Sequence, residues 1–156
     1  MLKAIFRGAT AGAAGTTALN AVTYLDMAIR GRPASSIPEQ AVEKAAQSAG
    51  MDIPGRGEER QNRLAGLGPL AGLATGTGIG VLFGLVRVLR IRPPALIDAV
   101  LVGAAAMAAT DLSMARLGVS DPRSWSATDW ISDALPHLAY GAVTHATLVG
   151  FERANR

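Results

Sequence analysis

Residues 64–86 form a run of twenty-three amino acids without a charged side chain. Within this run a glycine recurs at every fourth position: Gly68, Gly72, Gly76, Gly80 and Gly84. Because four residues advance an α-helix by about 400°, these glycines form a slowly winding groove about 24 Å long, near the thickness of the hydrocarbon core of a bilayer. The spacing predicts a membrane helix whose glycines let a neighbouring helix approach closely.

The same run would make a poor helix in water. Gly66 and Gly78 bring it to seven glycines, and each glycine costs about 1 kcal/mol relative to alanine in a water-exposed helix. In lipid an unpaired peptide group is so unfavourable that the helix is kept. The whole chain is 49% hydrophobic, 17% charged and only 4% aromatic. A soluble core would therefore lack the large side chains that usually dominate burial.

A second charge-free run covers residues 8–25 and follows a basic start. Its eighteen residues are just enough to span a bilayer. Gly8 and Gly12 repeat the four-residue spacing, so we expect a retained helix over residues 4–30 that packs on the glycine-rich helix. The alternative is a signal peptide that is cleaved near Ala13.

The first connection contains a predicted interfacial helix over residues 37–49. Ser36 and Glu39 have the spacing of a capping box at its start, and Gly50 follows its end. Its small apolar face suits a position at the membrane surface. Residues 51–63 contain proline, glycine and a run of charges, and they are predicted to be a solvated loop.

The second half of the chain predicts two more membrane helices. In the third segment, Asp98 and Asp111 leave only twelve charge-free residues between them, so a buried helix of a soluble protein is the alternative. Ser126 and Asp129 form a second capping-box pattern before the last helix. The fold class that we predict is all-α, a polytopic membrane protein whose four transmembrane helices cover residues 4–30, 64–91, 95–117 and 128–152.

The chain also contains an internal similarity. Residues 21–31 and residues 108–118 are identical at six of eleven positions. The helix that follows each copy carries a proline near its start, Pro69 in one case and Pro136 in the other. We interpret the chain as two repeated helical hairpins, the first enlarged by the interfacial helix. Chance similarity between alanine-rich segments is the alternative.

The basic residues predict the orientation. Seven of the fifteen lie in the short flanks formed by the two termini and the second connection: Lys3, Arg7, Arg87, Arg90, Arg92, Arg153 and Arg156. Lys and Arg in short loops favour the cytoplasmic side, so we expect both termini in the cytoplasm and the protein in the cell inner (plasma) membrane. Trp125 and Trp130 fall in a polar connection, which is typical of anchors in the headgroup belt.

Both ends of the chain resemble known membrane proteins. Residues 117–140 contain Gly118, Asp121-Pro122, Trp125, Trp130, Ser132-Asp133 and Pro136-His137-Leu138, and the chain closes on Glu152-Arg153. This string resembles the end of YagU-like small inner-membrane proteins. The segment Gly31-Arg32-Pro33-Ala34-Ser35-Ser36-x-Pro38-Glu39 is similar to one in uncharacterised actinobacterial membrane proteins. The resemblance implies a polytopic protein of about four helices and supplies no catalytic residues.

Six polar residues are candidates for a pathway through the membrane: Asn20, Asp26, Thr110, Asp111, His137 and His145. The two histidines, eight positions apart on one face of the last helix, could relay protons or hold a metal or haem. About 12 Å apart along one helix, they cannot both ligate one haem. Alternatively, Asp26 and Asp111 pair with Arg30 and Arg116 at the interface, and His145 is hydrogen bonded between helices.

Several function classes are excluded by the sequence. It has no cysteine for a thiol nucleophile or a zinc site. The glycine run at Gly76, Gly78 and Gly80 lacks the Lys-Ser/Thr of a phosphate loop. Its basic residues lie at segment ends and form no face for nucleic acid. We therefore expect no enzyme and no cofactor.

The leading hypothesis is a structural or accessory role, in which the glycine faces pack in a homo-oligomer or in a larger membrane complex. The alternative is a proton-coupled or small-solute transporter or channel that uses the intramembrane Asp and His residues. A soluble helical bundle is a third, more distant possibility.

Overall fold

The computed structural model describes residues 1–154 and is helical throughout, with no strand in that range. The predicted all-α class is confirmed. Five α-helices and two short 3₁₀ turns make up the fold: α1 (Leu2–Arg30), α2 (Ile37–Ser48), α3 (Gly57–Val86), η1 (Arg87–Leu89), α4 (Ala95–Arg116), η2 (Pro122–Ser124) and α5 (Ala127–Arg153). Arg156, one of the basic residues counted above, lies outside the described residues.

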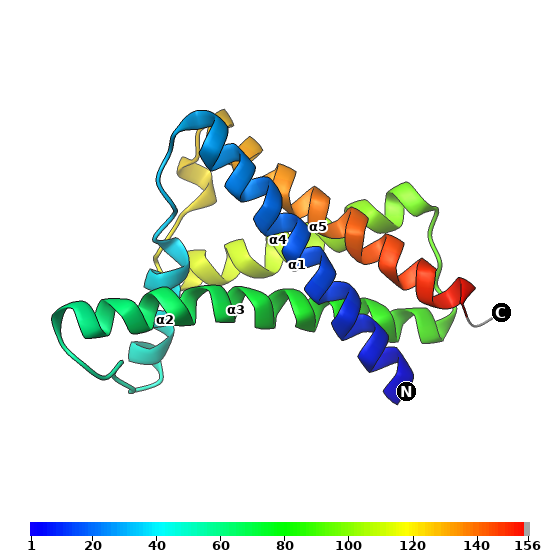
Figure 1. Cartoon of the computed structure of the whole chain (residues 1–156), viewed down its shortest axis with the longest axis horizontal. Coiled ribbons are helices and arrows are strands. Elements are labelled where there is room, and N and C mark those ends of the chain that lie inside the picture. Colours follow the sequence, from blue (N-terminus) through cyan, green and yellow to red (C-terminus); the bar gives the residue numbers. More distant parts are fainter. Residues whose placement is uncertain (155–156) are drawn as a thin grey trace.

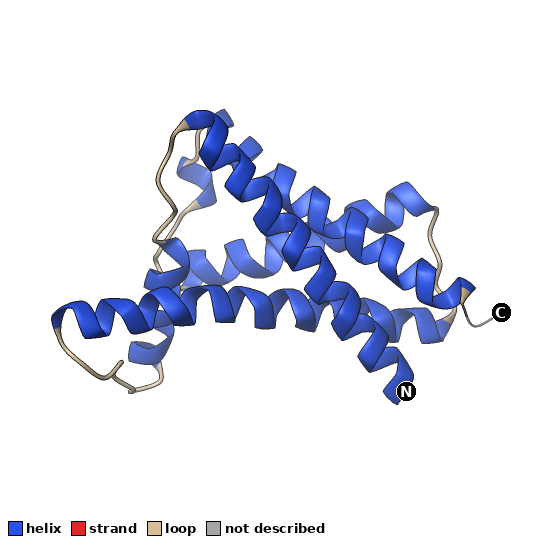
Figure 2. Cartoon of the chain, in the orientation of Figure 1, coloured by secondary structure: helices blue, strands red, loops and turns tan. Residues whose placement is uncertain are grey.

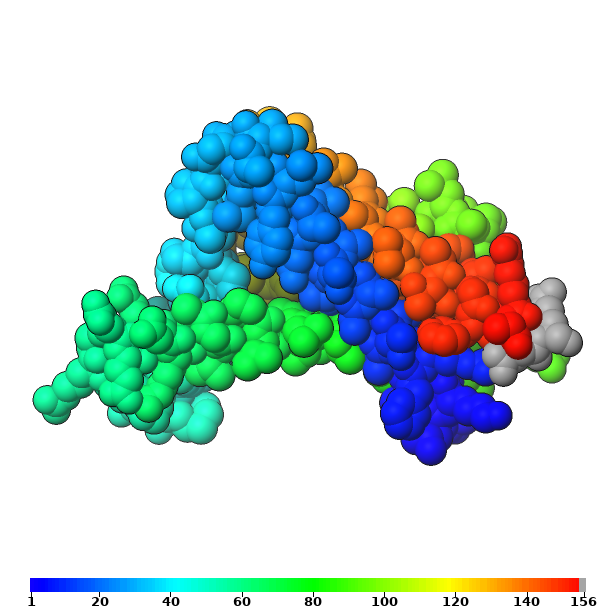
Figure 3. Space-filling view, in the orientation of Figure 1, coloured from blue at the N-terminus to red at the C-terminus, as the bar shows by residue number. Residues whose placement is uncertain are grey.

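The ends of the four long helices and the connections between them gather at two opposite ends of the fold (Figures 1 and 2). The N-terminus, η1, the start of α4 and the last turn of α5 lie together at what we call the terminal end. The end of α1, α2, the start of α3 and η2 lie at the opposite end, which we call the loop end. Figure 3 shows α1 and α5 lying against each other, while α1 diverges from the first half of α3. The N-terminus and the second connection therefore lie on the same side of the fold.

Helix α3 begins seven residues earlier than predicted, so the second half of the expected loop over residues 51–63 is wrong. Its first turn contains Glu58 and Glu59, which interact favourably with the positive end of the helix dipole. Glu59 also forms an ion pair of 2.7 Å with Arg63 four residues on. The charges that suggested a loop therefore stabilise the first turns of a helix.

The two predicted capping boxes have different outcomes. Ser126 caps α5 as expected, because its hydroxyl accepts from the Asp129 amide and the Asp129 carboxylate accepts from the Ser126 amide. Ser36 makes no such bond, and its hydroxyl instead accepts from the Gln40 side-chain amide at 2.8 Å. The capping box predicted at Ser36 and Glu39 is therefore wrong, although α2 does begin at Ile37.

Helices α1 and α3 touch through their backbones. A methyl group placed on Gly8 would lie 2.5 Å from the carbonyl oxygen of Gly80, and one placed on Gly80 would lie 2.6 Å from the backbone nitrogen of Gly12. A methyl on Gly84 would lie 2.7 Å from the carbonyl oxygen of Ala4. Real side chains do not approach this closely, so any larger residue at these positions would push the two helices apart.

The remaining glycines of the stripe have other surroundings. A methyl on Gly76 would collide with Thr16, whereas one on Gly68 would lie 3.1 Å from the backbone nitrogen of Glu39 in α2. Gly72 has no neighbouring atom of residues 1–154 within reach of such a methyl. The glycine stripe of α3 thus contacts α1 over its second half, contacts α2 near its start and is open between them.

Helices α4 and α5 make a second contact of the same kind. A methyl on Gly103 of α4 would lie 2.6 Å from the carbonyl oxygen of His137 in α5. A methyl on Gly141 of α5 would collide with Ala99 and would lie 2.6 Å from the Gly103 nitrogen. Beside this contact the small core is formed by Val102, Ala106 and Tyr140. The two helix pairs α1–α3 and α4–α5 are therefore both joined through glycine.

Large apolar side chains lie mostly on the outside of the fold. They are distributed over all four long helices and include Leu2, Ile5, Phe6, Leu25, Ile29, Leu70, Leu73, Leu82, Leu96, Ile97, Leu101, Leu112, Ile131, Leu135 and Leu138. By length and composition, two stretches within the described residues are candidates to cross a membrane, Gly57–Leu89 and Ala95–Arg116. Helices α1 and α5 are comparably long, but α1 is rich in Gly, Ala and Thr and α5 contains several polar residues.

We predict that Gly80→Ala and Gly78→Ala differ sharply, although they lie two residues apart in α3. Gly80→Ala should lower the free energy of unfolding by about 1 to 3 kcal/mol, because the new methyl would enter the backbone of α1. Gly78→Ala should change it by at most about 1 kcal/mol, since open space surrounds Gly78. Unfolding in detergent micelles gives the free energy of unfolding of both variants. Equal decreases in the two variants would contradict the close α1–α3 contact.

Candidate functional site

A buried ionic cluster lies at the terminal end, where α3, α4 and α5 meet. We call it the Arg87–Asp98 cluster, and it consists of Arg87, Asp98, His145 and Glu152. Arg87 follows the last residue of α3, Asp98 lies in the first turn of α4, and the other two residues belong to α5. The side chains of Arg87 and Asp98 are only 11% and 7% exposed.

The hydrogen bonds of the cluster converge on one carboxylate oxygen. Asp98 Oδ2 accepts from Arg87 Nη2 and lies 2.6 Å from His145 Nδ1. The same Nδ1 atom lies 3.1 Å from Arg87 Nη2, so the carboxylate, the guanidinium and the imidazole are in mutual contact. The other terminal nitrogen of Arg87, Nη1, donates to Glu152 Oε1 at 3.1 Å. Arg87 thus joins α4 to the last turn of α5.

Local sequence explains why these groups meet. Pro93 and Pro94 precede α4 and bring Asp98 into its first turn, where an acid interacts favourably with the helix dipole. His145 and Glu152 are seven residues apart, so they lie on one face of α5. The Gly103–Gly141 contact holds α4 against that face. The cluster needs all three elements and is not a local motif.

A second polar group lies further along the α4–α5 interface, toward the loop end. His137 Nδ1 lies 2.8 Å from the carbonyl oxygen of Asp133 and 3.4 Å from its carboxylate Oδ2. His137 Nε2 lies 3.5 Å from the hydroxyl of Thr110. Asp111 is close enough to interact electrostatically with Asp133 and His137. The buried Oδ2 of Asp133 has no hydrogen-bond partner among the described residues.

The six residues predicted to form a polar pathway do not come together. Thr110, Asp111 and His137 belong to the second polar group, whereas His145 belongs to the Arg87–Asp98 cluster. Gly103 and Gly141 lie between these two groups with their backbones in contact. The prediction that His145 belongs to one polar pathway with Asp26 and Asp111 is therefore wrong. Instead, His145 is hydrogen bonded between α5 and α4.

Asp26 and Asn20 lie elsewhere. Asp26 accepts from Arg30 at 2.7 Å, as the alternative interpretation has it, and also from Arg32 at 2.6 Å. Arg30 reaches further and donates to the Ser132 hydroxyl at 2.7 Å, which ties the end of α1 to the start of α5. Asn20 is exposed and lines an open groove where α1 diverges from α3. Asp26 therefore belongs to the ionic contacts of the loop end, and neither Asp26 nor Asn20 lies with His145.

The two tryptophans form a pair at the loop end. Their ring centroids are 5.2 Å apart, with an angle of 65° between the ring planes. The Trp125 indole N–H donates to the Ser120 hydroxyl at 3.0 Å, while Trp130 is 43% exposed. A ring pair with one anchored member and one exposed member suits the position of an interface anchor.

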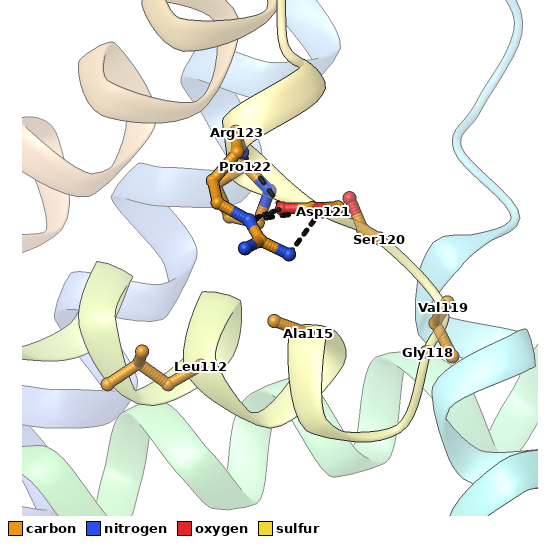
Figure 4. Close-up of a pocket in the computed structure, with 8 residues that line it drawn as sticks. All are labelled: Leu112, Ala115, Gly118, Val119, Ser120, Asp121, Pro122 and Arg123. Carbon is orange, nitrogen blue, oxygen red and sulfur yellow. Dashed lines mark hydrogen bonds and ion pairs between the residues drawn. The ribbon is translucent and has the colours of Figure 1, made fainter.

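A shallow groove beside this pair contains Asp121 and Arg123 (Figure 4). Arg123 folds back onto the Asp121 carboxylate, with its Nη2 atom at 2.9 Å. The hydrogen bonds from Arg123 hold the pKa of Asp121 below its ordinary value. Because the Asp121 carboxylate and the Arg123 guanidinium are hydrogen bonded to each other, neither is a free catalytic group in this groove. Across residues 1–154 no three His, Cys, Asp or Glu side chains are grouped to hold a metal ion.

Sequence reasoning missed three members of the Arg87–Asp98 cluster. The sequence pattern places Asp98 only at one end of the third segment, and Arg87 only in the basic flank of the preceding helix. The available signal was an acid four residues inside an apolar segment that begins after two prolines. An acid within an apolar segment needs a basic partner, and Arg87, Arg90 and Arg92 all lie in the short connection before it.

We predict that Asp98→Ala is far more destabilising than Glu59→Ala. The first removes the carboxylate that Arg87 and His145 both contact, and Arg87, whose side chain is only 11% exposed, keeps Glu152 alone, which should cost about 3 to 5 kcal/mol. The second breaks an ion pair whose carboxylate is 63% exposed, which should cost less than about 1 kcal/mol. The free energies of unfolding of the two variants are compared in the same detergent. Similar decreases would show that the cluster stabilises the fold no more than a surface ion pair does.

A scan against models of protein families, a search of curated proteins and a search of solved structures each found no match to this chain. The resemblance to YagU-like proteins therefore stays a prediction, and function is argued below from geometry.

Proposed function

We propose that this chain is a four-helix integral membrane protein with a structural or accessory role. In this proposal α1, α3, α4 and α5 span the inner (plasma) membrane and α2 lies at the interface. The observation that carries it is the outward placement of the apolar side chains. Only 17% of the most apolar window of α3, and 22% of that of α4, is buried inside the fold. A soluble bundle of this size would bury such faces.

The glycine contacts support the same proposal for the two less apolar helices. Each candidate span packs against one of them, α3 against α1 and α4 against α5, with backbones touching at glycine. Such packing is typical of membrane helices, where association depends on close contact and not on the burial of large apolar groups. Lipid would also surround Ile5 and Phe6 of α1 and Leu135 of α5, which are exposed.

The hairpin repeat is part of the proposal. Both copies of the repeated sequence end with a glycine in the left-handed conformation, Gly31 with φ 62° and Gly118 with φ 67°. The helix pair α1–α3 would form one hairpin and α4–α5 the other. In the orientation that we propose, the terminal end with its arginines faces the cytoplasm and the tryptophan pair lies at the opposite interface.

The surface that we assign to a partner is the outer face of α3. Gly76, Gly80 and Gly84 already contact α1, so they are not free for a second chain. Small exposed residues with helical spacing lie elsewhere on α3, namely Ala71, Ala74 and Gly78. This face would allow close approach by a helix of a second copy or of a larger complex.

We predict that Gly78→Leu abolishes assembly while leaving the monomer folded. The new side chain would project from the outer face of α3 and hold a partner helix away. Gly150→Leu is the matched control, because open space also surrounds Gly150 near the end of α5. Native mass spectrometry in mild detergent reports the assembly, and a complex that survives Gly78→Leu would count against this face.

The transporter alternative has one observation in its favour. Two histidines lie beside acids in the same α4–α5 interface, His145 with Asp98 and His137 with Asp133. Against it, the backbone contact of Gly103 and Gly141 between the two pairs leaves no room for a methyl group. A chain of water molecules needs more space than that.

We therefore expect no proton flux above that of protein-free vesicles when the chain is reconstituted and a pH gradient is imposed. A pH-sensitive dye inside the vesicles measures the flux. A flux that appears with the native chain and is lost in Asp98→Asn would favour the transporter over the structural role.

A further inference from the structure

The short connection between α3 and α4 alternates apolar and basic side chains. Leu89 and Ile91 are 70% and 52% exposed, and Arg90 and Arg92 beside them are also exposed. No helix of residues 1–154 covers this apolar pair. In a soluble protein such a loop would present two large apolar groups to water, whereas at a membrane surface the apolar groups face acyl chains and the arginines face headgroups.

The backbone of Arg90 is in the left-handed conformation, which residues with a side chain rarely adopt. Its φ is 60°, and among the described residues it is the only non-glycine with a positive φ. Glycine would be relaxed in this left-handed conformation, as it is at Gly31 and Gly118. Arg90 ends η1 in this conformation, and its backbone N–H donates to the Arg87 carbonyl oxygen, so an arginine stands at a cap position where glycine would be relaxed.

At the terminal end, no acidic side chain of residues 1–154 pairs with this arginine. Residues of that end supply six described basic side chains but only two acidic ones, Asp98 and Glu152. Asp98 is occupied by Arg87 and His145, and Glu152 by Arg87 and Arg92. The loop end has ten acidic residues against eight basic ones. Among residues 1–154, the side chains of the terminal end therefore carry an excess of positive charge.

We propose that Arg90 and Arg92 form a binding site for the phosphate of an anionic phospholipid, with Leu89 and Ile91 against its acyl chains. A guanidinium donates two parallel N–H bonds to phosphate oxygens, which suits a headgroup phosphate. Arg92 keeps a side chain that is 51% exposed while its Nε atom lies 3.7 Å from Glu152. This inference rests on the proposed membrane location and names a ligand for the cytoplasmic end.

The test uses the full chain reconstituted in vesicles of phosphatidylglycerol and phosphatidylcholine, extracted in mild detergent with its bound lipid. Native mass spectrometry then gives the ratio of the two lipids that remain bound. The native chain should retain phosphatidylglycerol preferentially. Each arginine removed, in Arg90→Gln and in Arg90→Gln with Arg92→Gln, should reduce the preference about fivefold at low salt. Arg116→Gln, which removes one charge at the loop end, should leave it unchanged.

A second variant separates binding from folding. Arg90→Gly should raise the unfolding temperature, because glycine relaxes the left-handed backbone, and it should still lose the lipid preference. An unchanged preference in Arg90→Gly, or equal losses in Arg90→Gln and Arg116→Gln, would overturn the site. Loss of the preference when millimolar inorganic phosphate is added would also overturn it, in favour of a site for free phosphate.

The membrane location is checked on the same vesicles by washing them in alkaline carbonate. A chain released into the supernatant contradicts the proposed function itself. A chain that stays in the pellet without any preference for phosphatidylglycerol contradicts the lipid site alone.

Discussion

The contact on which the structure depends is the one between the backbones of α1 and α3. No side chain separates the helices where Gly8 and Gly12 meet Gly80, so the helices approach as closely as peptide groups allow. This contact requires α1 to be built from Gly, Ala and Thr, which explains why α1 is less apolar than α3. Because small residues fill the inside, the large apolar side chains lie outside. That arrangement is stable where the surroundings are apolar too.

Close contact between smooth glycine faces does little to fix how far one helix slides along another. The polar groups at the two ends supply that restraint. At the terminal end Arg87 joins Asp98 of α4 to Glu152 of α5, and at the loop end Arg30 joins Asp26 to Ser132. Each group connects helices that are distant in the sequence, so the register of the bundle is fixed at both ends by directional bonds. In this view the histidine of the Arg87–Asp98 cluster serves packing.

The features that the sequence predicts correctly are those set by residues close to one another in the chain. The four-residue glycine period and the capping box at Ser126 are local patterns, and the structure has a helix or a helix start at each. The helix predicted to continue to residue 91 instead ends at Val86, and a 3₁₀ turn, η1, follows it to Leu89. The start of α3 was missed because Glu59 and Arg63 were read as loop charges and not as a pair on one helix face. The partner of His145 could not be read from the sequence at all. It depends on which face of α4 meets α5, and Gly103 and Gly141 decide that.

The same two glycines limit what the inside of the molecule can do. A proton that moved from His145 to His137 would have to pass the point where Gly141 touches Ala99 and Gly103. Transfer between groups so far apart needs a bridging water or hydroxyl, and neither fits in a contact that excludes a methyl group. An interior closed in this way favours the proposed structural role over the proposed transporter. The outside of the molecule is therefore the part available for interaction, where the outer face of α3 has small residues and the terminal end has the exposed side chains of Arg90 and Arg92.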